Sequence, residues 1–251
     1  MNERSQGARD LPRLVSFGVI VGLLVASAAI VFVQTKSDLF RSPDNLSQVV
    51  SKITGATFEV RCDSDWTGAG WGIELDQEHY VVTAQHVIED CLDGDVLAAR
   101  NAQTSLFSLQ IIHSSGSYWT DEGGTTDLAL LKASKVIPTL KFQREEPQIG
   151  QWVVTAGFPL EEDSGPLVNV NQGAITGFDM FSHIVIDASI SGGNSGGPVL
   201  NSRGEVVGTV YASDPPEEYE NLVYVQPIFE HCGIVIRCDE EGPVYSPHLV
   251  D

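Results

Sequence analysis

From Val49 onward, the chain alternates short apolar runs with turn-forming residues. Most runs are rich in β-branched and aromatic residues and are bounded by Gly, Asp, Asn or Pro, which is typical of β-strands. No long apolar stripe with the 3.6-residue repeat of a helix is present, so only residues 45–53 and 228–232 are expected to form short helices. The expected strands include residues 56–60, 70–75, 80–83, 128–131, 152–156, 183–186 and 205–211. Many short strands at close spacing predict an all-β protein, built as a sandwich or as barrels.

The N-terminal part has a different pattern. Residues 14–33 carry no charge, and about 20 apolar residues in a helix span the hydrocarbon core of a bilayer. Three basic residues precede this run, Arg4, Arg9 and Arg13, which predicts that the N-terminus is cytoplasmic and the rest of the chain lies outside. We therefore expect one N-terminal transmembrane helix.

A cleaved signal peptide is the alternative for this segment, because Ala26-Ser27-Ala28 resembles a cleavage site. The apolar run continues past that site through Val33, which favours the uncleaved anchor. Both interpretations export the body of the protein, one as a membrane-anchored form and the other as a secreted form.

Charge and cysteine content narrow the function. A formal net charge of −20 argues against nucleic acid as a partner, because phosphate binding needs Lys and Arg.

Four cysteines in an exported chain favour two disulfides, for which three pairings exist. We expect the two local pairings, Cys62 with Cys91 and Cys232 with Cys238. A zinc site is the alternative, but no C-x-x-C spacing supports it.

Residues 191–199 (SGGNSGGPV) hold glycines on both sides of Ser195. A serine at such a tight turn presents its hydroxyl outward, with backbone N–H groups around it, as an acyl-transfer nucleophile requires. A glycine-rich hairpin loop is the plain alternative. The nucleophile elbow of α/β-hydrolases also fits, but that fold needs long crossover helices and a later histidine, which would have to be His231 or His248.

A serine nucleophile needs a general base and an acid that orients it. His86 follows an apolar strand directly, and Asp127 immediately precedes another, so each is expected at a strand end near the edge of the core. The local alternative for Asp127 is a strand cap. The remaining histidines are expected to be partly exposed loop residues: His79, His113, His183, His231 and His248. The acidic residues nearer His86 in sequence, at positions 90, 93 and 95, fall in a polar loop.

The order His86, Asp127, Ser195, in the contexts TAQHV, TTDLALLK and GGNSGGPV, resembles that of chymotrypsin-fold serine proteases, most closely the bacterial Deg/HtrA branch. Three further segments are similar to that branch: GQWVV with AGFP at 150–159, QGAITG at 172–177, and DASI at 187–190. The resemblance covers roughly residues 49–229. It implies two six-stranded antiparallel β-barrels with the active site in the cleft between them.

The resemblance also implies roles for particular residues. Ser195 attacks the scissile carbonyl, His86 transfers the proton, and Asp127 orients His86. The backbone N–H groups of Gly193 and Ser195 form the oxyanion hole. No cofactor or metal is expected.

Specificity residues follow by the same analogy, and the expected first specificity pocket is lined by Ser189, Ile190, Thr209, Val210, Tyr211 and Ala212. No acidic side chain stands at these positions, so a small or medium apolar P1 residue is expected rather than a basic one. The strand at 209–212 is expected to pair with the substrate backbone.

The sequence departs from the branch in two ways. Deg/HtrA proteins usually carry a PDZ domain after the protease, and the sequence ends at Asp251, so regulation through a PDZ-bound peptide is not expected. Asn194 stands where trypsin-like zymogens have Asp, so activation by a freed N-terminus is not implied.

The expected organisation is a cytoplasmic tail (1–13), an anchor (14–33), a stalk (34–47), a protease domain (48–240) and a C-terminal tail (241–251). The leading hypothesis is a membrane-anchored extracytoplasmic serine endopeptidase that cleaves polypeptides, in protein quality control, as a homotrimer. Two alternatives stay open: a secreted V8-like protease, and a protease-like binding or sensor module with a latent site.

Overall fold

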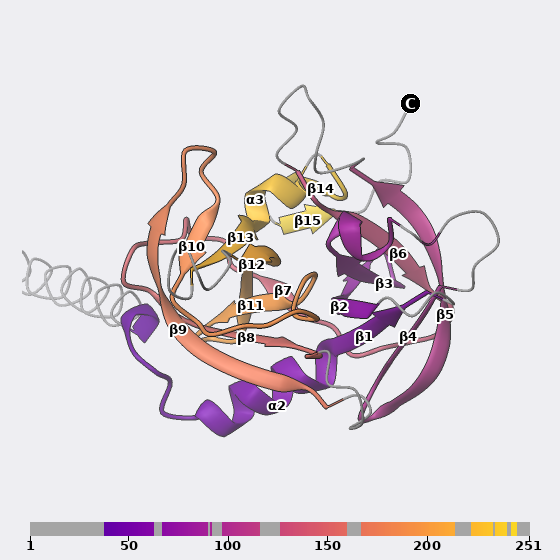
Figure 1. Ribbon diagram of the computed structural model, residues 1–251, viewed down its shortest axis with the longest axis horizontal. Helices are drawn as coiled ribbons and strands as arrows, with labels where there is room; N and C mark the ends of the chain where they lie inside the picture. The colour runs from indigo at the N-terminus through magenta and orange to yellow at the C-terminus, as the bar shows by residue number, and fades with distance from the viewer. Residues whose placement is uncertain are drawn as a thin grey trace, which may run out of the picture.

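The computed structural model describes residues 38–62, 67–89, 91, 97–115, 126–159, 167–213, 222–232, 234–239 and 242–244. They form two β-barrels packed side by side (Figure 1). The first barrel is a closed ring of six antiparallel strands in the order β1-β2-β3-β6-β5-β4. Its strands are β1 (Thr57–Arg61), β2 (Thr67–Leu75), β3 (Glu78–Thr83), β4 (Ala98–Asn101), β5 (Thr104–Ser114) and β6 (Ala129–Ala133).

The second barrel is also closed. Its sheet has the order β11-β8-β9-β10-β13-β12-β7, and an additional pairing between β11 and β12 joins six antiparallel strands into a ring. The seventh strand, β7, pairs with β12 in parallel. The expectation of two six-stranded antiparallel barrels is confirmed. The strands are β7 (Lys141–Phe142), β8 (Trp152–Gly157), β9 (Asn169–Phe178), β10 (Ile184–Ile186), β11 (Pro198–Asn201), β12 (Glu205–Ser213) and β13 (Val223–Pro227).

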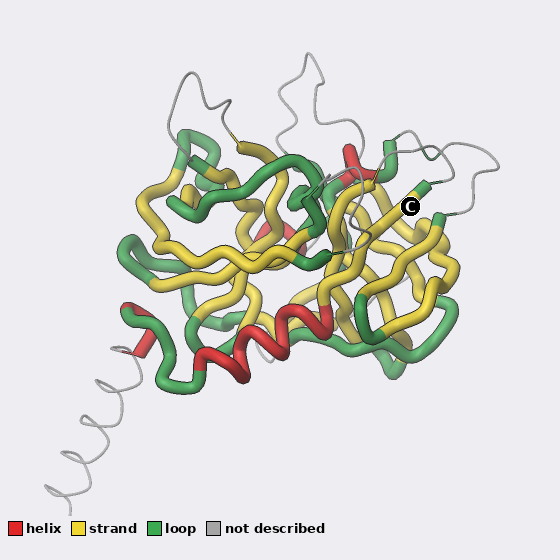
Figure 2. Tube along the Cα trace, turned by 60° about the horizontal axis from the view of Figure 1, so that its bottom comes forward, coloured by secondary structure: helices red, strands yellow, loops and turns green. Residues whose placement is uncertain are grey.

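Few helices accompany the barrels among the described residues. The longest is α2 (Leu46–Ala56), which runs along one side of the molecule and leads directly into β1 (Figure 2). It buries Val49, Ile53 and Ala56, a spacing that places all three on one face of a helix. The others are α3 (Ile228–His231) and two 3₁₀ turns, η1 (Asp38–Phe40) and η2 (Gln85–Val87). Both helices expected from the sequence are present.

The chain ends differ from the expected organisation. Residues 14–33, the expected anchor, lie outside the described residues, and no helix within the described part is long and apolar enough to cross a membrane. The expected stalk belongs to the folded body from Asp38 onward, because Leu39 is buried and the Ser202 hydroxyl donates to the Asp38 carbonyl at 2.6 Å. The expected C-terminal tail contributes β15 (Gly242–Val244), which pairs with β14 (Arg237–Asp239).

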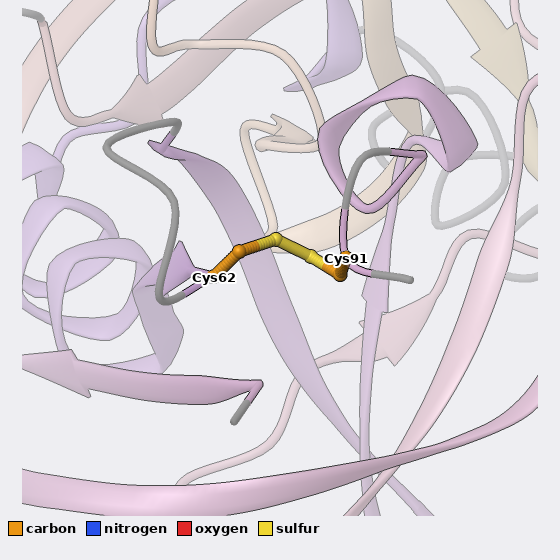
Figure 3. The surroundings of a disulfide bond; sticks show 2 residues. All are labelled: Cys62 and Cys91. Atoms are coloured by element: carbon orange, nitrogen blue, oxygen red, sulfur yellow. A yellow bond between two sulfur atoms is a disulfide. The ribbon is translucent and has the colours of Figure 1, made fainter. Parts of the chain in front are cut away.

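The predicted disulfide between Cys62 and Cys91 is confirmed (Figure 3). It links the end of β1 to the segment that follows η2, with a Cα–Cα distance of 5.4 Å. Cys232 is also disulfide-bonded. The side chain of Cys238, its predicted partner, lies outside the described part of the chain.

A buried polar link joins the two barrels. Trp71 of β2 donates its Nε1–H to the hydroxyl oxygen of Thr209 in β12 at 3.0 Å. The same hydroxyl lies 2.8 Å from Nε2 of His231 in α3, and Nδ1 of His231 lies 3.1 Å from the Pro227 carbonyl. Because a carbonyl can only accept, Nδ1 carries the proton, and Nε2 accepts from the Thr209 hydroxyl. His231 is therefore held as a neutral ring.

This burial makes stability depend on pH. Burial lowers the pKa of His231 to about 4, whereas the unfolded chain binds a proton near 6.5. The unfolded state then binds more protons between these values, so the His231 contribution is present above pH 6.5 and is lost as the pH falls toward 4. The difference in unfolding free energy amounts to about 3 kcal/mol over the whole window.

The variant His231→Gln tests this pH dependence. When the free energy of unfolding is measured in urea at pH 7 and at pH 4.5, the variant should lose less of it between the two pH values than wild type. An equal loss of unfolding free energy at pH 4.5 in wild type and variant would contradict the buried neutral ring.

The Cys62–Cys91 disulfide should contribute independently to stability. It closes a loop with a sequence separation of 29, for which the chain-entropy estimate is about 3–4 kcal/mol. The double variant Cys62→Ala/Cys91→Ala is therefore expected to unfold at a lower urea concentration, while the Cys232 disulfide stays intact in both proteins. An unchanged unfolding free energy would show that this cross-link does not constrain the unfolded chain.

Candidate active site

His86 and Asp127 are 41 residues apart in sequence and meet because β3 and β6 are antiparallel neighbours. Thr83, at the end of β3, pairs with Ala129, at the start of β6. The η2 turn that carries His86 therefore begins beside the segment that carries Asp127. The strand ends predicted from the apolar runs place both side chains at the same edge of the first barrel.

The contact between them is bidentate. One carboxylate oxygen of Asp127 accepts from the backbone N–H of His86 at 2.9 Å, and the other lies 2.5 Å from the ring Nδ1. An ionised carboxylate only accepts, so Nδ1 carries the proton and Nε2 of the neutral ring is left with a lone pair. Asp127 is 1% exposed, whereas the side chain of His86 is 28% exposed. The ring can thus meet a solvent-borne substrate while its orienting acid stays in the core.

The second barrel also holds Asp127. Its backbone N–H donates at 3.1 Å to the side-chain carbonyl of Gln226, a buried residue of β13. The sequence pattern did not single out Gln226. The only indication in the sequence is that Gln226 is a polar residue in the otherwise apolar run VYVQPI. A polar side chain that is buried at such a position needs a hydrogen-bond partner.

The loop that carries Ser195 is bonded to both barrels. The Ser195 carbonyl accepts from the N–H of Ala69 in β2 at 2.8 Å, and Gly196 donates to the Val210 carbonyl in β12 at 2.7 Å. Gly196 has φ +83° and lies so close to the Ala69 carbonyl and the Thr83 hydroxyl that a Cβ would overlap both. Thr83 ends the strand that leads into η2. The loop therefore lies beside the segment that carries His86, and only glycine fits after the serine.

Among the described residues, the N–H groups of Gly193 and Ser195 have no protein acceptor. Gly193 has φ +92° and its carbonyl accepts from Phe158 N–H at 3.1 Å, while Asn194 N–H donates to Ser191. Within the described residues, neither Gly193 N–H nor Ser195 N–H donates a hydrogen bond, and the Ser195 hydroxyl makes none. A pair of free N–H groups beside a serine is an arrangement that can bind an oxyanion.

The predicted specificity residues are only partly accessible. Ser189 is exposed and Ile190 is half-buried. Thr209 and Tyr211 are buried and hydrogen-bonded inside the protein, Thr209 to Trp71 and His231, and Tyr211 to His183. Their side chains thus bond other protein groups, and their role in a specificity pocket stays a prediction.

Two of the remaining specificity positions add little open surface. Val210 is buried in an apolar cluster against which Ile190 packs. The side chain of Ala212 lies outside the described part. The β12 backbone is what this strand offers to a ligand.

The other histidines also differ from expectation. His183 and His231 are 1% and 0% exposed, so neither is a partly exposed loop residue. His183 directly precedes β10 and His231 lies in α3. Both stand beside apolar residues in the sequence, and these neighbours were the available indication of burial. His79 and His113 are half-buried on β3 and β5, and His248 lies outside the described residues.

The family profile of the trypsin-like peptidase domain matches residues 68–208, more than half of the 251-residue chain. The curated relatives include a probable periplasmic serine endoprotease DegP-like of Pseudomonas putida (strain F1), 32% identical over 144 residues. That match covers 55% of this chain and 28% of the relative. The protein of the same description in Chlamydia trachomatis serovar D is 33% identical over 150 residues, which cover 55% of this chain and 27% of the relative. The chain thus spans under a third of the length of these relatives.

A solved structure agrees with the fold. The serine endoprotease from Yersinia pestis superposes with a TM-score of 0.61 at 26% sequence identity, covering 76% of this chain and 65% of that one. The two closed barrels, the order of the matched segments and the sequence relatives together lead to one assignment. The chain belongs to the trypsin-like peptidase family, on its Deg/HtrA branch.

Proposed function

We propose that this protein is an extracytoplasmic serine endopeptidase that uses Ser195, His86 and Asp127. The observation that carries the proposal is the bidentate pair of His86 and Asp127 beside a serine loop with two free N–H groups. Family membership supports the same reaction class.

The proposed reaction proceeds through an acyl-enzyme. Ser195 Oγ attacks the scissile carbonyl while His86 Nε2 takes the hydroxyl proton, and His86 then gives that proton to the leaving amine. Asp127 keeps Nδ1 protonated and stabilises the imidazolium. A water molecule, activated by the same ring, releases the acyl group. The N–H groups of Gly193 and Ser195 stabilise the oxyanion, and one such donor typically contributes about 2.7–4 kcal/mol to lowering the barrier.

The free Ser195 hydroxyl supports a second candidate function. No hydrogen bond joins it to His86, although both residues are described. Catalytic hydrogen bonds often form only in the substrate complex, which agrees with the peptidase. A binding or sensor module with a latent site would leave the same bond unformed, and chemical labelling separates the two.

The substrate is proposed to add a strand to β12. Val210 is bonded through its backbone to Gly196 and Gly197, and no described strand pairs with Ala212 or Ser213 on the edge opposite β13. A peptide backbone can pair with such an edge. Ser189 and Ile190 are the predicted specificity residues nearest to solvent, and neither carries a charge, so a small or medium apolar P1 residue is proposed.

The proposed location is outside the cytoplasm. The Cys62–Cys91 disulfide fits an oxidising compartment, and the curated relatives are named as periplasmic. We propose anchoring through residues 14–33, with the N-terminus in the cytoplasm. The homotrimer and the role in quality control stay predictions.

The triad is tested by labelling the full chain with a fluorophosphonate probe. Wild type should label, Ser195→Ala should not, and Asp127→Asn should slow labelling by about four orders of magnitude, because the His86 ring loses its tautomer. Ser108→Ala, an exposed serine on β5, is the matched control and should label like wild type. A folded wild-type protein that never labels would leave the binding module as the better account.

The P1 preference is tested with a series of peptides that differ only at P1. Val or Ala should give kcat/KM values about tenfold or more above Lys, because an uncharged pocket does not compensate for desolvating an ammonium group. Equal values for Lys and Val would contradict the proposed pocket. Ser195→Ala provides the blank for each peptide.

A further inference from the structure

A second cluster of polar side chains surrounds His183, which directly precedes β10. Asp179 closes the turn between β9 and β10: one carboxylate oxygen accepts from the N–H groups of Phe181 and His183, both at 2.8 Å. Its other oxygen lies 2.9 Å from Nδ1 of His183. Since the carboxylate only accepts, Nδ1 carries a proton that it donates to Asp179. The proposed reaction does not use either residue.

Tyr211 connects this cluster to the peptide-binding edge. Its hydroxyl oxygen lies 2.7 Å from Nδ1 of His183, the rings are 5.0 Å apart, and both side chains are buried. Tyr211 directly follows Val210, whose N–H and carbonyl bind Gly197 and Gly196. Tyr211 therefore lies between the residue that anchors the serine loop and the edge of β12 at Ala212 and Ser213.

On the other side of the ring stands a carboxyl group. Oε2 of Glu230, in α3, lies 3.7 Å from Nε2 of His183, and these two buried atoms have no hydrogen-bond partner. With the proton of the neutral ring on Nδ1, Nε2 and an ionised carboxylate would present two lone pairs to each other. A single additional proton, on Nε2 or on the carboxyl group, converts this repulsion into a hydrogen bond.

We infer that His183 is a positioning residue for peptide binding, which holds Tyr211 and the open edge of β12 in place while one proton is shared between its Nε2 and the Glu230 carboxyl. This inference rests on the proposed function. His183 touches neither the scissile bond nor the triad, so its effect is on peptide binding and not on the chemical step.

The electrostatics give the direction of the pH dependence. Burial, and secondarily the charge of Asp179, raise the pKa of Glu230 to about 7. Among the described residues, His183 lies next to this carboxyl and Asp179 acts on it through its charge. Tyr211 contacts the opposite nitrogen of the His183 ring, and His231 faces Thr209 instead. The Glu230 carboxyl carries its proton below pH 7 and loses it as the pH rises through that value. Peptide binding should weaken in this range.

The test measures kcat and KM for one cleavable peptide between pH 6 and 8.5, on the full chain. Wild-type KM should rise about fivefold across the range, the value of one hydrogen bond. Glu230→Gln does not titrate and should have a nearly constant KM. Tyr211→Phe should raise KM about fivefold at pH 6, with a similar kcat. Glu78→Gln, an exposed glutamate on β3 of the other barrel, is the matched control and should keep the wild-type profile.

Fluorophosphonate labelling of the same samples separates the two proposals, because it needs the triad but no paired peptide. Normal labelling of every variant, with a KM profile in Glu230→Gln that still rises like wild type, would overturn the positioning role and leave the peptidase intact. Normal labelling with a wild-type KM in Tyr211→Phe would do the same. A wild type that neither labels nor cleaves would overturn both.

Discussion

The site depends on the fact that one loop is hydrogen-bonded to two barrels at once. The Ser195 carbonyl is bonded to Ala69 of the first barrel, and the next residue, Gly196, is bonded to Val210 of the second. These bonds fix the serine beside the strand end that leads to His86. If either barrel shifted relative to the other, the serine and the histidine would separate, because each is positioned by different strands.

Further contacts between the two barrels keep them in this relative position. The Trp71–Thr209–His231 link crosses the same boundary inside the core, and Gln226 of the second barrel holds the backbone of Asp127 in the first. An apolar cluster contains side chains of α2 and of both barrels. Closed barrels suit this task, because they have few free edges and their strand ends are fixed relative to one another.

The sequence predicted most of the architecture and the candidate triad. Ser195 was visible because glycines are rarely needed on both sides of one residue, and His86 and Asp127 because each adjoins an apolar strand. Strand β5 was not among the runs that the sequence pattern picked out, and Leu106 and Ile111 on it are exposed, which blurs the alternation that marks a half-buried strand.

The inward-facing polar contacts could not be predicted. Thr209 and Tyr211 bond partners that are far apart in sequence, so their orientation follows from the closure of the barrel and not from local pattern. His183 and His231 were expected to be partly exposed loop residues because neither has the strand-to-turn setting of His86. Their burial depends on partners supplied by α3, β12 and the turn before β10.

The central claim is that hydrogen bonds from the serine loop to both barrels hold Ser195 next to His86. The N–H groups of Gly193 and Ser195 are then already positioned to bind an oxyanion. A crystal structure of the full chain inhibited by a peptidyl phosphonate tests it most directly. The account predicts a covalent bond to Ser195 Oγ, a phosphonyl oxygen that accepts from the N–H groups of Gly193 and Ser195, and an inhibitor backbone paired with β12 beyond Val210. A phosphonyl oxygen turned away from those N–H groups, or an inhibitor that leaves the β12 edge unpaired, would contradict it.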